Sequence, residues 1–495
     1  MDRATLQARL ALLGGGDPLA ASDVTLVALP SLEVDRHVLE RHVGVLSACE
    51  ERSLYQLLLL RRPDLRIVFV SSEPVPEDLI DHYLRLIPGV SPAAAARRVT
   101  LISPEDATPR PLGEKLLDRP DLIAELRLAI GDPHRAFMAP YSVTEVELDL
   151  AAALGIPIYG PDPRHAVWGT KSGARWLFAQ EGIPHPVGVE GMRDAADVAE
   201  AAATVRAMRP DAPAVVVKLD EGIYGEGNRV LALTRLPPPG GPTERRELRR
   251  RVEALGEEYL AEVLEGGAVV EELVVAEELR SPSGQVRVRA DGATCEVSTH
   301  EQILGGDTGQ TFVGCRFPAF GGYAAQIAAH TEAIARRLGR EGVMGRLGVD
   351  FVAGRRPDGR WAAHAIEINL RDGGTTHSFG ALRLLTGGDY DSQQAVFRTA
   401  AGEERCYRAS DDLEDPAWVG LRFDELHAAA VLAGVGWDPA AQTGTVFHMM
   451  RSLPTEGRIG ATSIGLSPEH ADALYERTVA LLHRLAARQP TVLGA

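Results

Sequence analysis

The sequence predicts an α/β protein whose central part is α+β. From the first residue to about residue 160, short apolar runs alternate with segments whose apolar residues follow helical spacing. This alternation is typical of a parallel sheet covered by helices on both faces. From Ala268 to Leu304, and again from Leu347 to Leu370, β-patterned runs follow one another, which favours antiparallel strands.

The N-terminal elements are short strands separated by amphipathic helices. We expect strands at Val24–Leu29, Arg66–Val70, Arg98–Leu101, Arg135–Met138 and Ile156–Gly160, and helices at Val38–Leu60, Glu77–Leu86 and Val143–Leu154. The glycines at Gly14–Gly16 are followed by Asp rather than by Lys-Ser or Lys-Thr, so this run does not form a phosphate-binding P-loop.

The later elements are more varied. Helices are expected at Lys171–Gln180, before a Gly-Ile-Pro stop signal, and at Asp194–Met208, Glu244–Leu264 and Pro468–Ala487. Ala214–Val217 reads as a buried strand, and the segment after Gly387 mixes strands and helices. The 495 residues are compatible with about three domains.

Charge and composition exclude several classes of protein. The chain has 52 Lys and Arg against 69 Asp and Glu, a net charge of −17, which argues against a protein that coats nucleic acid. The four cysteines are widely spaced and form no CxxC motif, so neither a disulfide scaffold nor a thiolate zinc site is expected. The first residues do not resemble a signal peptide, and no apolar run could span a membrane. We expect a cytoplasmic protein without a membrane partner.

The stretch Gly348–Gly374 predicts a metal site. Two β-patterned runs flank Asp358-Gly359, a strong hairpin turn signal. A turn centred there places Asp350 directly opposite Glu367, with Asn369 on the same face and Val349, Phe351, Ile366 and Ile368 on the other. Opposed like charges destabilise a sheet unless a cation lies between them, and carboxylate and amide oxygens suit Mg²⁺ or Mn²⁺. The alternative is a solvated hairpin whose acidic residues keep a sheet edge soluble.

A second group of residues suggests phosphate binding. The strand Ala214–Val217 ends at Lys218 and is followed by Gly222, Gly225 and Gly227. Glycines let backbone amides approach phosphate oxygens, and a lysine adds a compact positive charge. The same glycines could instead form a mobile hairpin. Lys171 lies near a helix start, where a lysine is usually solvated. The backbone amide and carbonyl groups of the strand around Glu271 could bind adenine. Alternatively, this segment could be an ordinary strand at the edge of a sheet.

Taken in order, these pieces resemble the ATP-grasp superfamily. The resemblance rests on Lys171, VVVKLDEGIYGEGN, VVEELVVAEE, GVDF and IEIN, across roughly residues 140–380. Five segments of the chain are most similar to peptide ligases of the pheganomycin type. These segments are YSVTEVE, THEQIL, EINLRDGGTTHSFGALRLLTGG, GTVFHMM and GRIGATSIG. The resemblance implies a Rossmann-like pre-ATP-grasp domain at 1–160, a small ATP-grasp lobe at 161–275, a large lobe at 276–387 and a C-terminal extension at 388–495.

The resemblance also implies a role for particular residues. Lys171 and Lys218 would contact ATP phosphates under a lid containing Gly225 and Gly227. Glu271 and Leu273 would face adenine, and Glu278 would bind ribose. Asp350, Glu367 and Asn369 would hold two Mg²⁺ ions, with Mn²⁺ as an alternative. Arg371 and the amides of Gly373 and Gly374 would stabilise the reaction's anions. Arg287 and His300 are candidate substrate residues, with a structural ion pair and a core histidine as the alternative readings.

The expected reaction joins a carboxylate to an amine through an acylphosphate, with ATP converted to ADP and phosphate. Amino acids or peptides are the expected substrates. Two alternatives remain open: an ATP-grasp enzyme with a thiol or phosphoryl acceptor, and a non-catalytic ATP-binding module. A protein-kinase reading fails because the sequence has no HRD or DFG element. The extension is expected either to cap the substrate cleft or to form a homodimer contact.

Overall fold

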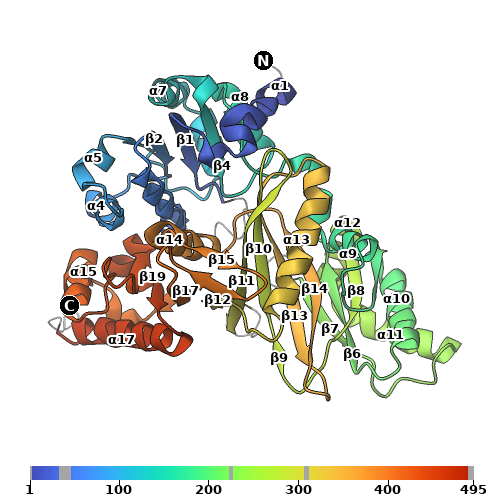
Figure 1. Cartoon of the computed structure of the whole chain (residues 1–495). Coiled ribbons are helices and arrows are strands. Elements are labelled where there is room, and N and C mark those ends of the chain that lie inside the picture. The colour runs from blue at the N-terminus through green and yellow to red at the C-terminus, as the bar shows by residue number, and fades with distance from the viewer. Residues whose placement is uncertain (1–2, 33–45, 222–226, 306–310, 489–495) are drawn as a thin grey trace, which may run out of the picture.

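The computed structural model describes residues 3–32, 46–221, 227–305, 311–488. Figure 1 shows an N-terminal layer at the top, a large central sheet, a small lobe to one side in green and a C-terminal part in red. The α/β class with an antiparallel core predicted from the sequence is confirmed. No helix in these described ranges is long and apolar enough to cross a membrane.

The N-terminal layer is a four-stranded parallel sheet in the order β3-β2-β1-β4. Its strands are β1 (Val24–Leu29), β2 (Leu65–Val70), β3 (Val99–Ile102) and β4 (Ala136–Pro140). Alternate residues of β1 point into two different cores. Leu26 packs with one cluster of buried side chains, and Val27 packs with another. The sheet is therefore covered on both faces, as the sequence predicted.

Helices cover this sheet. They are α1 (Arg3–Ala8), α3 (Leu46–Glu50), α4 (Glu77–Leu86), α5 (Pro92–Ala96), α6 (Leu112–Leu117), α7 (Pro120–Ile130) and α8 (Glu145–Leu154), with the 3-10 helix η4 (Glu51–Arg61). The first half of the helix predicted at Val38–Leu60 lies outside the described residues. The strand predicted at Ile156–Gly160 is reduced to a single bridge between Ile158 and Met138.

The small lobe is a four-stranded antiparallel sheet in the order β5-β8-β6-β7. Its elements are β5 (Gly188–Met192), β6 (Ala214–Leu219), β7 (Asn228–Ala232), β8 (Ala268–Glu272), α9 (Lys171–Gln180), α10 (Ala195–Met208), α11 (Pro242–Glu253) and α12 (Glu257–Gly266). The single helix predicted at Glu244–Leu264 was wrong. Gly256 has φ of 101° and separates α11 from α12, a backbone conformation that only glycine adopts readily.

The central sheet has eleven strands and is the largest element of the molecule. The large lobe contributes β9 (Leu279–Arg280), β10 (Pro282–Val288), β11 (Thr294–Gly305), β12 (Thr311–Phe317), β13 (Gly345–Arg355) and β14 (Trp361–Asn369), with α13 (Ala324–Arg340) and α14 (Thr376–Thr386). Apolar side chains from α13, α9, β10, β13 and β14 form one core.

The C-terminal part continues this sheet. It contains β15 (Asp389–Asp391), β16 (Val396–Arg398), β17 (Glu404–Glu414), α15 (Phe423–Leu432), β18 (Gly444–His448), α16 (Leu453–Glu456), β19 (Arg458–Gly465) and α17 (Pro468–Ala486). Strand β17 pairs with β12, where Cys315 lies opposite Ala409. The central sheet therefore includes strands from both sides of residue 387.

The C-terminal part also shares its hydrophobic core with the N-terminal layer. One cluster of buried side chains includes Leu54 and Leu79 near the start of the chain, Phe379 on α14 and Leu426 on α15. Removing a buried side chain from α15 should therefore weaken a core that spans distant segments.

We predict that Leu426→Ala lowers the free energy of unfolding by about 2–5 kcal/mol, because the substitution leaves a cavity in this shared core. Leu426 is 0% exposed, whereas Leu432 on the same helix is 89% exposed. Leu432→Ala is the matched control and should change stability by less than about 0.5 kcal/mol. Denaturant unfolding measures both, and equal losses would contradict the shared core.

Candidate functional site

The hairpin β13–β14 has the register predicted for its acidic residues. Asp350 is paired directly with Glu367, and Asn369 lies two residues further along β14. Val349 and Ile368 are buried in the core that contains α13. Asp350 and its two partners therefore face away from that core, on one side of the hairpin.

The hairpin differs from the prediction closer to its turn. A bulge shifts the register, so that Phe351 pairs with Ala365, and residues 356–360 connect the strands. The two-residue turn centred on Asp358-Gly359 was wrong. Ile366 is only half-buried and does not join the apolar face predicted for it, because the extra residue of a bulge has no direct partner and alters the strand's twist.

Positive and amide groups already surround the two carboxylates. Lys171 Nζ lies 2.8 Å from Glu367 Oε1. Asn369 Nδ2 donates to Asp350 Oδ2 over 2.9 Å, and Gln302 Nε2 donates to Asp350 Oδ1 over 2.7 Å. Burial and, to a smaller extent, the neighbouring charge of Glu367 raise the pKa of Asp350 to about 6. This set of oxygen ligands fits a hard divalent cation such as Mg²⁺.

A second buried ion cluster joins α9 to the small-lobe sheet. Lys218 Nζ lies 2.6 Å from Glu271 Oε2, and Arg175 Nη1 lies 2.8 Å from Glu271 Oε1. Burial alone would raise the pKa of Glu271, but Lys218 and Arg175 hold it below its usual value. Arg175 also contacts Glu190 over 2.6 Å. Glu271 therefore fixes the position of Lys218 near the end of β6.

The segment after β14 places the Arg371 guanidinium next to Asn369, one of the predicted metal ligands. Arg371 Nη2 donates to Asn369 Oδ1 over 3.0 Å, and its Nη1 donates to the carbonyl of Asp372. The Gly373 amide donates to the Thr376 hydroxyl over 2.9 Å, so this amide is engaged within the described structure. A Cβ atom on Gly374 would lie 2.7 Å from the Phe312 ring, which leaves room there only for glycine.

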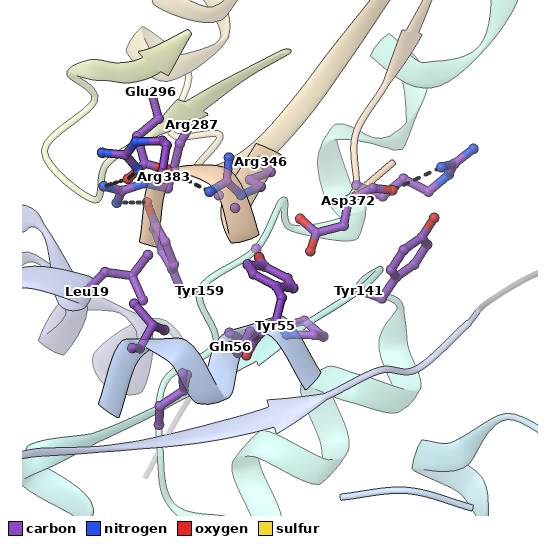
Figure 2. Close-up of a pocket in the computed structure, with 18 of the residues that line it drawn as sticks. Leu19, Tyr55, Gln56, Tyr141, Tyr159, Arg287, Glu296, Arg346, Asp372 and Arg383 are labelled. Carbon is purple, nitrogen blue, oxygen red and sulfur yellow. Dashed lines mark hydrogen bonds and ion pairs between the residues drawn. The ribbon is translucent and has the colours of Figure 1, made fainter. Parts of the chain in front are cut away.

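A pocket lies between the N-terminal layer and the large lobe, and Arg371 lines one side of it. Figure 2 shows Arg287, Glu296 and Arg383 gathered at one end and Asp372 with Tyr141 at the other. Burial alone would raise the pKa of Glu296, but the surrounding arginines hold it well below its usual range.

Arg287 is one of these pocket residues and is tied into an ion network. It contacts Asp17 over 2.6 Å and Glu296 over 2.7 Å. Arg346 and Arg383 contact the same glutamate over 2.6 and 2.9 Å. Three guanidinium groups therefore share Glu296 at this end of the pocket.

Comparison with known proteins identifies the family. The chain is 30% identical over 442 residues to L-propargylglycine–L-glutamate ligase of Streptantibioticus cattleyicolor, covering 87% of this chain and 89% of that protein. The chain belongs to the ATP-grasp superfamily of ligases. A family described as the PGM1 C-terminal domain matches residues 425–478, which include most of α15, all of β18 and β19, and the first part of α17.

Solved structures of other ATP-grasp proteins share the fold. The biotin carboxylase domain of 2-oxoglutarate carboxylase from Hydrogenobacter thermophilus, solved with MgADP, ADP and bicarbonate, gives a TM-score of 0.55 at 14% identity and covers 94% of each chain. Biotin carboxylase from Campylobacter jejuni gives a TM-score of 0.56 at 13% identity, covering 94% of this chain and 95% of that one. Membership makes the present chain an ATP-dependent ligase that forms C–N bonds.

The residues expected around the nucleotide base lie on or near β8 of this ATP-grasp ligase. The Leu273 amide donates to the carbonyl of Ala214 over 3.0 Å. Glu278 contacts Arg280 over 2.6 Å. Gly227 is buried beside the Leu219 side chain, while Gly225 lies outside the described residues. The nucleotide roles of these residues stay predictions.

His300 is a core residue rather than part of the pocket in Figure 2. It is fully buried, and burial lowers its pKa to about 3. Its ring nitrogens lie 2.9 Å from the Ser298 hydroxyl and 3.2 Å from the Tyr407 hydroxyl. These contacts favour the structural reading of His300 over the substrate-binding one.

Sequence reasoning missed three residues of this region. Arg175 follows Lys171 by one helical turn, and that spacing could have placed both on one face of α9. Gln302 reaches Asp350 from β11, two strands away from β13 in the sheet order. Arg346 enters the pocket from β13. For the last two residues, only the sheet order reveals the contact.

We predict that Glu271→Ala lowers the free energy of unfolding by about 3–5 kcal/mol, because it leaves the buried Arg175 and Lys218 without their shared counter-charge. Glu190→Ala removes the more exposed partner of Arg175 and serves as the matched control, with a smaller loss expected. Chemical denaturation of both variants measures the difference. A loss below about 1 kcal/mol for Glu271→Ala would contradict the importance of this ion cluster.

Proposed function

We propose that this ATP-grasp ligase uses ATP and Mg²⁺ to join the carboxylate of one amino acid or peptide to the amine of another. The observation that carries the proposal is the pairing of Asp350 with Glu367 next to Lys171. The relative from Streptantibioticus cattleyicolor is named for a reaction between two amino acids, and this name supports the same substrate class here. Dependence on ATP agrees with the cytoplasmic location predicted from the sequence.

The first chemical step brings two anions together. The substrate carboxylate attacks the γ-phosphorus of ATP, the bond between the γ-phosphorus and the bridging oxygen breaks, and ADP leaves. Asp350, Glu367 and Asn369 would hold Mg²⁺, which would supply positive charge next to the phosphate oxygens. Lys171 and Arg371 lie beside these ligands, and this placement supports a role for both in lowering the repulsion between the anions.

Lys218 can serve the phosphates without leaving a buried charge unpaired. If its ammonium turns from Glu271 toward a phosphate, Arg175 still holds the glutamate at 2.8 Å. Retaining one partner avoids the cost of an uncompensated buried carboxylate. The proposed role of Arg175 is therefore to position Glu271 while Lys218 binds nucleotide.

The second step forms the amide. The amine attacks the acyl carbon of the acylphosphate, the C–O bond to phosphate breaks, and the amine loses a proton. We place the second substrate in the pocket of Figure 2, which Arg371 lines together with Arg346 and Asp372. Guanidinium groups suit the carboxylate of an amino acid, and the Asp372 carboxylate suits its ammonium.

We predict that Asp350→Asn lowers kcat for ADP release at least about 100-fold, because it removes a charged ligand of the proposed metal site. Asp358→Asn lies in the exposed turn of the same hairpin and is the matched control. That variant should stay within about twofold of the wild type, since it touches no proposed ligand. Steady-state ADP release at several Mg²⁺ concentrations measures both, and retention of activity in folded Asp350→Asn would refute the metal assignment.

We predict that a screen of paired amino acids and short peptides releases ADP only with complementary pairs and yields an amide. Mass spectrometry should find a product with the mass of both substrates less one water, together with phosphate. Formation of a thioester or of a phosphorylated acceptor would instead support the alternative acceptors. ATP binding without turnover for any pair would support a non-catalytic module.

A further inference from the structure

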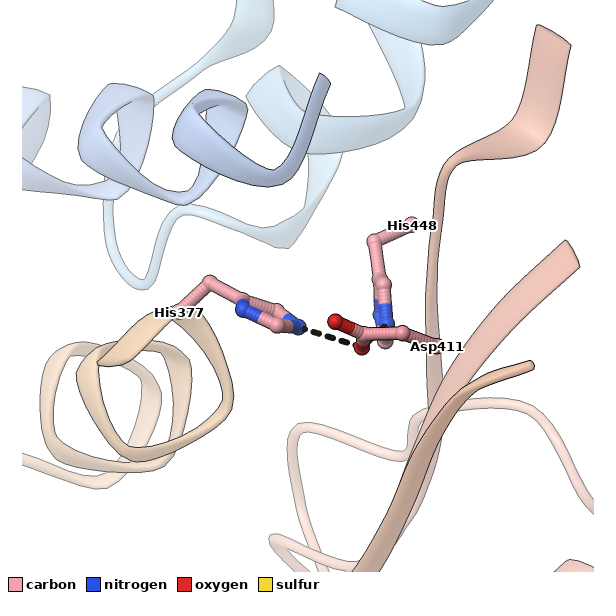
Figure 3. A group of neighbouring side chains, drawn as sticks. All are labelled: His377, Asp411 and His448. Carbon is pink, nitrogen blue, oxygen red and sulfur yellow. Dashed lines mark hydrogen bonds and ion pairs between the residues drawn. The ribbon is translucent and has the colours of Figure 1, made fainter. Parts of the chain in front are cut away.

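Three polar side chains from separate parts of the chain meet in a buried position outside the nucleotide site. Figure 3 shows His377, Asp411 and His448 pointing toward one another. They lie on α14, on β17 and at the end of β18. Their exposed fractions are 5%, 9% and 2%. One nitrogen or oxygen atom from each lies within 4.8 Å of the other two.

Hydrogen bonds satisfy only part of this group of three side chains. His448 Nε2 lies 2.8 Å from Asp411 Oδ1. His377 Nε2 lies 3.2 Å from the same oxygen, but within the described part of the chain this buried nitrogen has no hydrogen-bond partner of acceptable geometry. Leaving a buried polar atom unpaired is unfavourable, and a cation between the three side chains would satisfy it.

The residues around the group hold the ligands in place. Arg52 contacts Asp411 Oδ2 over 3.2 Å, which favours the ionised carboxylate and leaves Oδ1 facing the two histidines. A Cβ atom on Gly460 would lie 2.2 Å from His448 Nε2, so the glycine opposite His448 on β19 makes space for the ring. A neutral imidazole can offer a lone pair to a metal.

We propose that His377, Asp411 and His448 bind one Zn²⁺ ion that joins the large lobe to the C-terminal part of the chain. Two imidazole nitrogens and one carboxylate oxygen are typical zinc ligands, whereas Mg²⁺ prefers oxygen alone. Three protein ligands leave the fourth position of a tetrahedral zinc ion to a water molecule, and the small exposure of all three side chains keeps the site away from bulk solvent. The site is separate from the Asp350–Glu367 pair and does not depend on the ligase reaction.

The location gives the ion a defined effect on the enzyme. Helix α14 begins at Thr376, shortly after Arg371 and Gly373. An ion that ties α14 to β17 and β18 would fix the start of this helix and thereby the segment that carries Arg371. His377, Asp411 and His448 are therefore proposed as positioning residues, with no contact to the reacting atoms.

The direct test is a Zn²⁺ titration of chelator-treated protein against a competing chromophoric chelator. We expect one Zn²⁺ per chain with a Kd below about 1 μM and a rise in melting temperature of at least about 3 °C on binding. Substitution with Co²⁺ should give the visible ligand-field absorption of a low-coordinate nitrogen and oxygen site. Failure of the wild-type protein to bind Zn²⁺ more tightly than about 0.1 mM would show a metal-free His–Asp–His network and overturn the proposal.

Variants locate the bound ion. His377→Ala and His448→Ala should each weaken Zn²⁺ binding by at least about 100-fold, because each removes a ligand. His82→Ala is the matched control, since His82 is also a buried histidine, at 5% exposure, and lies outside the group. Asp350→Asn should keep its zinc while losing ligase activity, which separates failure of this proposal from failure of the proposed function. Equal zinc loss in His82→Ala, or full retention in the two ligand variants, would refute the site.

Discussion

The repulsion between Asp350 and Glu367 is the constraint on which the arrangement of the lobes depends. The hairpin places these carboxylates directly opposite each other, and burial makes their charge more costly. The structure meets this cost with groups from three other segments: Lys171 from α9, Gln302 from β11 and Arg371 after β14. Lys171 thereby adds an ion pair to the hydrophobic packing that already joins α9 to the central sheet.

The same principle operates at a second position with the charges reversed. Lys218 and Arg175 are buried cations that require Glu271, just as the two hairpin carboxylates require Lys171. Each lysine is therefore paired with a carboxylate, and Glu271 has Arg175 as a second partner. A net charge of −17 on the whole chain is compatible with such local groups of positive side chains.

The parts of the fold that could be predicted are those encoded by local patterns. Apolar runs located the parallel strands, and the hairpin signal placed Asp350 opposite Glu367 although the turn itself is longer than predicted. Contacts between distant segments could not be predicted. Arg287 is neutralised by Asp17, 270 positions earlier, and the bulge that displaces Ile366 leaves no mark in the period-two pattern. Such features depend on sheet order, which one sequence does not reveal.

The C-terminal part shows why sheet order matters for function. Its strand β17 extends the central sheet beyond β12, and the same strand carries Asp411 toward His377 on α14. Helix α14 lies directly after the segment that contains Arg371. A C-terminal part that merely covered a cleft would need none of these connections. Because it shares a sheet, a core and a group of polar side chains with the large lobe, it supports α14, which begins shortly after Arg371.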